Sequence, residues 1–109
     1  MATAYKVLGQ VAPSATTATA VYTVPSATEA VVSSVTVCNR AASAGTFRLA
    51  VRPDGATLAN QHYVVYDANI DANDSIILTI GVTMDATDVL EAYASSGDMT
   101  FHAYGSEIS

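Results

Sequence analysis

The sequence predicts an all-β fold of about eight antiparallel strands, arranged as a jelly-roll or related Greek-key β-sandwich. Short runs of Val, Ile, Leu, Tyr and Thr recur along the chain, and turn-forming residues such as Gly, Pro, Asn, Asp and Ser close each run. No apolar stripe with the 3.6-residue spacing of an amphipathic helix accompanies these runs. A chain of 109 residues can bury a core without disulfides or metals, so we expect a single β-sandwich domain over residues 1–109.

The first three strands are expected at Ala4–Val11, Thr19–Val24 and Glu29–Asn39. Pro13 and Pro25 follow the first two and fit inter-strand turns, because proline cannot donate a main-chain hydrogen bond within a sheet. The third strand is the longest and is expected to be central. Ser33–Ser34 within it indicates a bulge or a change of face.

The fourth predicted strand, Thr46–Arg52, alternates apolar and other side chains most clearly. One set should face the core and the other should face outward. The inward set is Phe47, Leu49 and Val51, and the outward set is Arg48, Ala50 and Arg52. The strand ends at Pro53–Gly55, where proline starts a turn and glycine supplies a positive φ.

The second half of the chain is expected to contribute four further strands, at Gln61–Tyr66, Ser75–Ile80, Val89–Ala94 and Met99–Tyr104. Asp67–Asp74 is predicted to be the loop between the fifth and sixth. Its alternating oxygen side chains resemble the start of a calcium loop, but Ala72 stands where such a loop needs glycine and Leu78 where it needs a bidentate Glu. We therefore expect a polar loop with Asx-turns and no bound metal.

The charge balance excludes several classes of partner. Ten acidic residues outnumber four basic ones, and the net charge of −6 repels nucleic acids and anionic lipid surfaces. Neither a signal-peptide pattern nor an apolar run long enough to span a bilayer is found, so no membrane association is expected. Only 13% of the residues are charged, which favours a surface that is partly hidden in an assembly.

No catalytic constellation is found, and no enzymatic activity or cofactor is expected. The sequence has no nucleophile elbow, phosphate-binding loop, dinucleotide fingerprint or pair of zinc-binding cysteines. Cys38 is the only cysteine, and its place in an apolar run predicts a small core residue. As a nucleophile it would need His62 or His102 brought close by the fold, and nothing in the sequence places either histidine there.

Arginine and tyrosine supply the candidate interface residues, because both are enriched where proteins meet. Arg48 and Arg52 share the outward face of the fourth predicted strand. They would form bidentate pairs either with carboxylates of a partner subunit or with acids on the adjoining strand of the same chain. The candidates are Arg40, Arg48, Arg52, Tyr63, Tyr66 and Tyr104.

Five segments spread over nearly the whole chain resemble a group of small virion structural proteins from marine and cyanobacterial tailed phages. These segments are Ala4–Gln10, Val21–Pro25, Val35–Arg40, Phe47–Pro53 and Tyr104–Ile108. The resemblance implies a non-enzymatic decoration (cement) protein that is made in the host cytoplasm. It would be present on the capsid exterior as a homotrimer. The resemblance also implies that the major capsid protein or other virion proteins are its partners.

Two other functions are compatible with the same fold and composition. A tail, collar or fibre component would be present in few copies per particle, whereas a decoration protein would be present in hundreds. A carbohydrate-binding module or adhesin would bind a glycan of the host surface.

Overall fold

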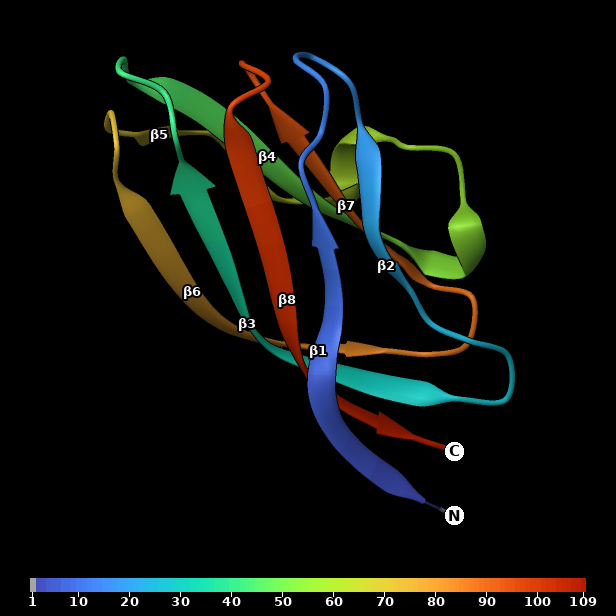
Figure 1. The fold of residues 1–109 in the computed structure, drawn as a ribbon. Helices are drawn as coiled ribbons and strands as arrows, with labels where there is room; N and C mark the ends of the chain where they lie inside the picture. Colours follow the sequence, from blue (N-terminus) through green and yellow to red (C-terminus); the bar gives the residue numbers. More distant parts are fainter. Residues whose placement is uncertain (1) are drawn as a thin grey trace.

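Eight antiparallel strands form two four-stranded sheets that face each other across a shared core (Figure 1). The computed structural model describes residues 2–109. One sheet has the strand order β1-β8-β3-β6, and the other has the order β2-β7-β4-β5. The strands are β1 (Thr3–Val11), β2 (Thr19–Thr23), β3 (Glu29–Asn39), β4 (Gly45–Arg52), β5 (Tyr63–Ile70), β6 (Ser75–Met84), β7 (Val89–Ala94) and β8 (Met99–Ile108).

The pairing follows the pattern of one long hairpin rolled up into two sheets. The first strand pairs with the last, the second with the seventh, the third with the sixth and the fourth with the fifth. This is the connectivity of a jelly roll, so the predicted fold class is confirmed. Two short 3-10 turns, η1 (Pro53–Gly55) and η2 (Asn60–His62), connect β4 to β5. None of the described helical segments is long and apolar enough to cross a membrane.

The core is filled by the inward half of the side chains of each sheet. At its centre Phe47 of β4 meets Phe101 of β8 edge to face, with ring centroids 6.1 Å apart. Both rings are almost completely shielded from solvent, as is Leu49. The alternation predicted for β4 is confirmed, because Phe47 and Leu49 are buried in the core while Arg48 lies on the opposite face of the strand.

The predicted ranges of β1, β2, β3, β4 and β7 agree with the structure to within one residue at each end. β3 is the longest strand and lies between β8 and β6, as expected. The bulge predicted at Ser33–Ser34 is confirmed by a shift of register between Val32 and Ser34 on both sides of β3.

The prediction for β5 is wrong at both ends. Its expected first residues belong to η2, and the strand continues through the expected loop as far as Ile70. Only residues 71–74 connect it to β6. Asp67 adopts a positive φ of 51° inside the strand, and the resulting bulge lets Ile70 reach the core. The polar side chains of this stretch face outward, which made the sequence resemble a loop.

The predicted ends of β6 and β8 are also wrong, because each strand continues beyond a glycine. Gly81 has a φ of 57° and forms a bulge, after which β6 resumes and buries Met84. Gly105 lets β8 lie very close to β3, because a Cβ at residue 105 would stand 1.9 Å from the carbonyl oxygen of Val31.

Cys38 does not fill the core as predicted. β3 turns Val35 and Val37 inward, so Cys38 is half-buried on the outer face of its sheet. A polar residue, Asn39, takes the next inward position and is 1% exposed. The apolar run that contains Cys38 therefore spans both faces of the sheet, and only alternate members of the run belong to the core.

Asn39 is fully hydrogen-bonded at the end of the core. Its side-chain amide donates to the carbonyl oxygens of Ser43 and Asp71, and its Oδ1 accepts the main-chain N–H of Ala41. A buried amide without such partners would destabilise the fold. Asn39 therefore holds together the turn after β3 and the turn after β5, which connects to β6.

The β1 and β2 strands close one side of the sandwich. A Cβ at Gly9 would lie 2.0 Å from the carbonyl oxygen of Val21, a main-chain atom that cannot rotate away. Only glycine permits this close approach of two main chains. The opposite side of the sandwich, formed by β5 and β6, has no such crossing.

Glu107 ties the end of β8 to strands of both sheets. Its carboxylate lies 2.8 Å from Lys6 Nζ on β1 and accepts a hydrogen bond from the Tyr22 hydroxyl on β2. The hydrogen bond from Lys6, followed by that from Tyr22, lowers the pKa of Glu107. Burial and the bond to Glu107 raise the pKa of Tyr22. The chain ends lie nearby, where Ala2 and Ser109 exchange main-chain hydrogen bonds (Figure 1).

We expect Gly9→Ala to lower the free energy of unfolding by about 2 kcal/mol, because the new methyl group forces β1 away from β2. Gly97→Ala is the matched control, since the nearest atom to a Cβ there is 3.9 Å away. Its effect should stay within about 0.5 kcal/mol. Urea denaturation of both variants measures the difference, and equal midpoints would contradict the crossing of β1 over β2.

Acid is expected to weaken the fold through Glu107. The pKa of Glu107 is lower in the folded protein than in the unfolded chain, where it is about 4.3. Its ionised form therefore stabilises the fold fully above about pH 4.3, and this stabilisation is lost as the pH falls through the lower pKa of the folded state. Glu107→Gln should lower stability at pH 7 by about 1 kcal/mol and flatten the fall in urea midpoint below about pH 5. Glu29→Gln, at an exposed position of β3, is the control. An unchanged acid dependence in Glu107→Gln would rule out this role.

Candidate interaction surface

Aromatic and charged side chains gather on the outer face of the β2-β7-β4-β5 sheet. β4 supplies Arg48 to this face because its neighbours Phe47 and Leu49 point into the core. Strands β5 and β7, on either side of β4, supply the remaining members. We call the group the Arg48 cluster, and it consists of Arg48, Tyr63, Tyr66, Asp67 and Tyr93.

Arg48 is held between two aromatic rings. Its guanidinium carbon lies 4.3 Å from the ring centroid of Tyr66 on β5 and 4.2 Å from that of Tyr93 on β7. Tyr93 stands directly opposite Arg48 in the β4–β7 register. Tyr63 packs edge to face against Tyr66, with ring centroids 4.9 Å apart. Tyr66 and Tyr93 therefore restrict the position of a single guanidinium group, and Tyr63 packs against Tyr66.

A bidentate ion pair fixes the orientation of the same guanidinium. Arg48 Nε donates to Asp67 Oδ1 at 2.6 Å, and Nη2 donates to Oδ2 at 3.3 Å. The hydrogen bond that Arg48 donates to Asp67 raises the pKa of Arg48 above its ordinary value. The ion pair and the two rings together hold the Arg48 guanidinium in one position.

The bulge in β5 explains why two consecutive residues reach Arg48. In the β4–β5 register Phe47 stands opposite Ala68 and Leu49 opposite Val65, so two residues of β5 share the place opposite Arg48. These two are Tyr66 and Asp67, and the positive φ of Asp67 turns its carboxylate to the same face as the tyrosine ring. Regular pairing would have sent one of the two to the core face.

A buried ion pair lies beside the cluster. Arg52 Nε is 3.2 Å from Glu91 Oε1, and Arg52 also donates to the carbonyl oxygens of Gly55 and Ala56. Glu91 is 8% exposed, and among residues 2–109 its Oε2 has no hydrogen-bond partner. A hollow of about 10 Å³, roughly the space of one water-sized group, lies next to it between Leu58, Tyr63 and Tyr93.

Three of the six predicted interface residues come together, and three do not. Arg48, Tyr63 and Tyr66 belong to the cluster. Arg52 is used within the chain, by Glu91 and the η1 turn. Arg40 lies at the end of the sandwich and donates to the carbonyl oxygen of Gly97.

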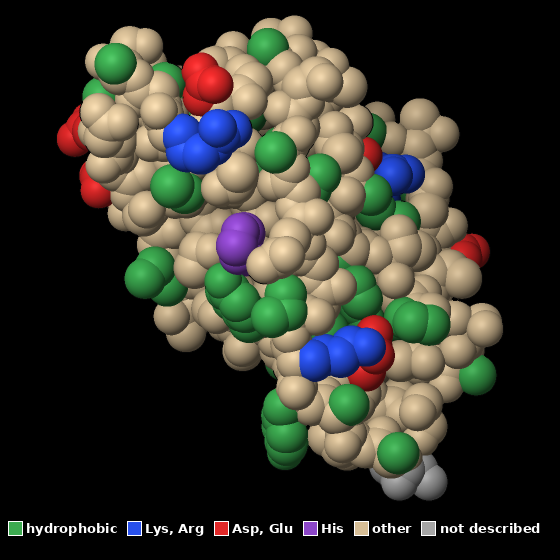
Figure 2. Space-filling view, viewed as in Figure 1, with side chains coloured by type: hydrophobic (Ala, Val, Ile, Leu, Met, Phe, Trp, Pro, Cys, Tyr) green, Lys and Arg blue, Asp and Glu red, His purple; other side chains and the backbone are tan. Residues whose placement is uncertain are grey.

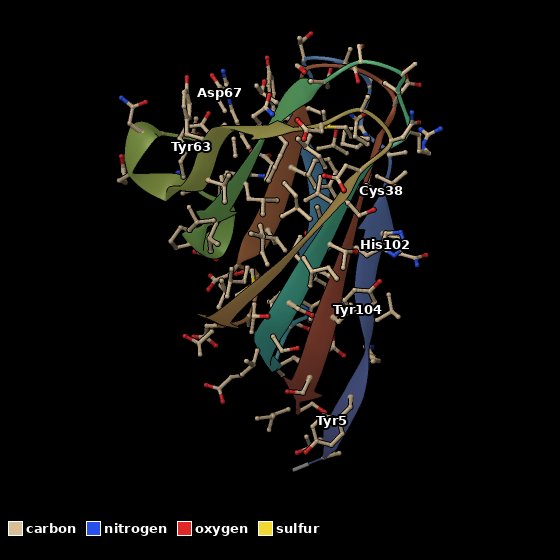
Figure 3. All side chains as sticks on the ribbon, turned by 90° about the vertical axis from the view of Figure 1, so that its left-hand side faces the viewer. Tyr5, Cys38, Tyr63, Asp67, His102 and Tyr104 are labelled. Atoms are coloured by element: carbon tan, nitrogen blue, oxygen red, sulfur yellow. The ribbon has the colours of Figure 1, made fainter. Side chains whose placement is uncertain are left out.

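Tyr104 lies on the other sheet, where its hydroxyl contacts His102. In Figure 3, Tyr63 and Asp67 stand on one side of the sandwich, while Cys38, His102, Tyr104 and Tyr5 stand on the other. Figure 2 shows the outer face of the β1-β8-β3-β6 sheet, where charged side chains are few and scattered. The two faces of the protein therefore differ in chemistry.

Arg48 and Arg52 each pair with an acid on an adjoining strand of the same chain, which is the second of the two pairings considered from the sequence. Sequence reasoning missed Tyr93 and the role of Asp67. The alternation of β7 was the available signal for Tyr93, which follows the inward Ala92. No signal identified Asp67, because its contact depends on a bulge.

The cluster offers planar, amphipathic groups and no activated nucleophile. The carboxylates of the segment that resembled a calcium loop have partners of their own, since Asp67 binds Arg48 and Asp74 accepts the main-chain N–H of Ser75. Residues 2–109 contain no group of three or more potential metal ligands. The chain matches no protein-family model and no curated protein. Arginine and tyrosine, which make up most of the cluster, are residue types enriched at protein interfaces.

We expect Asp67→Asn to free the Arg48 guanidinium while leaving the fold intact, because asparagine tolerates the positive φ of residue 67. In the wild type, the Arg48 Nε–H should give a sharp NMR signal with slow hydrogen exchange. In the variant, the signal should broaden or exchange at least about tenfold faster. Asp71→Asn removes a carboxylate that pairs only with Asn69 and is the control. An unchanged Arg48 signal in Asp67→Asn would show that the rings alone order the guanidinium.

Proposed function

We propose that this protein is a non-enzymatic virion structural protein, and specifically a capsid decoration protein that binds the outer shell and stabilises it by bridging capsid subunits. The observation that carries the proposal is the Tyr66–Arg48–Tyr93 stack with its internal ion pair. Arginine and tyrosine are the residue types most enriched at interface hot spots, and an ordered side chain loses little entropy on binding. The resemblance to small phage virion proteins supplies the biological setting.

The surface around the cluster is suited to docking. Tyr66 is 58% exposed, although its ring contacts both Arg48 and Tyr63. The guanidinium is already neutralised by Asp67, which reduces the electrostatic cost of covering it with a partner. An acidic chain of net charge −6 is correspondingly expected to approach a partner surface through this locally neutral patch.

Oligomeric binding fits the proposal. Each docking contact of a small module is weak, and several modules linked together bind with much higher avidity. The homotrimer implied by the resemblance would provide three copies of the cluster. The expected partners are the major capsid protein or other virion proteins, and the expected location is the capsid exterior.

We expect Tyr66→Ala to weaken binding to purified capsids at least about tenfold, because it removes one ring of the stack. Co-sedimentation of the purified protein with capsids measures the effect. Arg40→Ala and Tyr104→Ala are the controls, since one lies at the end of the sandwich and the other on the opposite sheet. Circular dichroism verifies that each variant keeps the wild-type fold.

Particle composition decides between this proposal and its rivals. Hundreds of copies per particle on the shell exterior, by quantitative mass spectrometry and cryo-electron microscopy, would support decoration. A dozen copies or fewer at the tail vertex would favour a tail, collar or fibre component. Absence from particles, or a monomer that does not bind expanded capsids, would overturn the proposal.

Binding of host-surface glycans, together with no binding to capsids, would select the carbohydrate-binding alternative.

A further inference from the structure

The edge of the β1-β8-β3-β6 sheet formed by β6 is open. β3 is the only described strand that pairs with β6, so every second residue of β6 directs its main-chain N–H and C=O away from the sheet. On the opposite side of the sandwich, β1 and β2 pack against each other around Gly9. Figure 3 is a view onto the β5–β6 side, where β6 runs along the front of the molecule.

The composition of β6 does not protect this edge. From Ser75 to Met84 the strand has no charged residue and no proline, the usual devices that block pairing with another chain. Ile77 is 70% exposed, more than any other large aliphatic side chain within residues 2–109. The bulge at Ile80 and Gly81 interrupts the strand, so its regular part is Ser75–Thr79. The edge of β5, by contrast, is bulged twice and carries Asp67.

We propose that β6 is a self-association edge, at which two copies of this chain pair their Ser75–Thr79 segments antiparallel with Ile77 opposite Ile77. In this register the outward side chains of Ser75 and Thr79 stand opposite each other on both sides of the central isoleucine pair. Serine–threonine and aliphatic pairs are favourable cross-strand neighbours. The inward Ile76 and Leu78 also stand opposite each other, which makes the two cores continuous.

Charge selects this register, and the self-complementary pairing of the segment favours a second copy as the occupant. Asp74 and Asp85 flank β6, and pairing along its whole length would place these two acids opposite each other. The register centred on Ile77 places Asp74 opposite Ile80 instead. Since each copy carries a net charge of −6, two copies repel each other over most of their surfaces. The uncharged β6 edge lets them approach without opposing like charges.

The resulting contact is isologous, and it joins two four-stranded sheets into one continuous sheet of eight. Its two-fold symmetry distinguishes it from any contact that closes a trimer. It also leaves the Arg48 cluster free, because the cluster lies on the outer face of the other sheet. The inference therefore goes beyond the proposed function and does not depend on which partner the cluster meets.

Sedimentation equilibrium over a concentration series tests the proposal. We expect wild-type chains, or the trimers of the proposed function, to associate in pairs and Ile77→Lys to weaken this pairing at least about tenfold, because the substitution sets two ammonium groups opposite each other. Thr83→Lys is the matched control. It adds the same charge to the same face of β6 but lies beyond the Gly81 bulge, so it should leave the dissociation constant within about twofold.

A crosslink tests the register. In a Cys38→Ser background, Ile77→Cys should form an intermolecular disulfide on mild oxidation, because directly opposed residues of antiparallel strands have Cα separations within the disulfide range. Thr83→Cys should not crosslink. A protein that is monomeric at all concentrations, or an oligomer unaffected by Ile77→Lys, would overturn the proposal. Protection of the β6 amides only upon addition of capsids would also overturn it and would make a partner's strand the occupant.

Discussion

The contact between Phe47 and Phe101 is the interaction on which the rest of the structure depends. It joins β4 to β8 across the middle of the sandwich, with both rings buried and in edge-to-face contact. Since successive side chains of a strand point to opposite faces, the inward direction of these rings fixes the outward direction of their neighbours. Arg48 is placed on one outer surface of the protein and His102 on the other. The chemical difference between the two surfaces follows from this core contact.

The β5 bulge adds what regular alternation cannot provide. A regular strand would present one residue of β5 beside Arg48, either a ring or a carboxylate. The bulge presents Tyr66 and Asp67 together, at the cost of a positive φ at a residue that is not glycine. The guanidinium thereby gains an aromatic contact and a bidentate ion pair from one strand, and a second aromatic contact from Tyr93 on the other side. The local irregularity of β5 is thus the feature that builds the Arg48 cluster.

Periodicity predicted the parts of the fold that obey it. The strict alternation of β4 and the turn residues between strands were enough for the fold class and for the faces of Arg48 and Phe47. Prediction failed where the chain departs from regular pairing. β5 and β6 contain bulges at Asp67 and Gly81, and a bulge resembles the end of a strand in a sequence. Cys38 was misplaced because an apolar run does not reveal which of its members face the core.

The same limits explain which parts of the candidate site were predicted. Arg48, Tyr63 and Tyr66 were identified from residue type, since arginine and tyrosine are frequent at interfaces, and for Arg48 also from its outward place in the alternation of β4. Asp67 was missed as the partner of Arg48 because the pairing of β4 with β5 joins residues nineteen positions apart, and only the bulge brings this carboxylate to the outer face.

The two open strands of the sandwich have different properties, and the difference separates two kinds of contact. β5 is irregular, so its edge is a poor template for another strand while its face carries the Arg48 cluster. β6 is regular and uncharged between Ser75 and Thr79, so its edge can accept a strand while its face carries only small polar groups and Ile77. A copy that uses the β6 edge therefore keeps its cluster accessible. Two weak contacts at independent places are sufficient to bridge a surface, because each raises the effective concentration for the other.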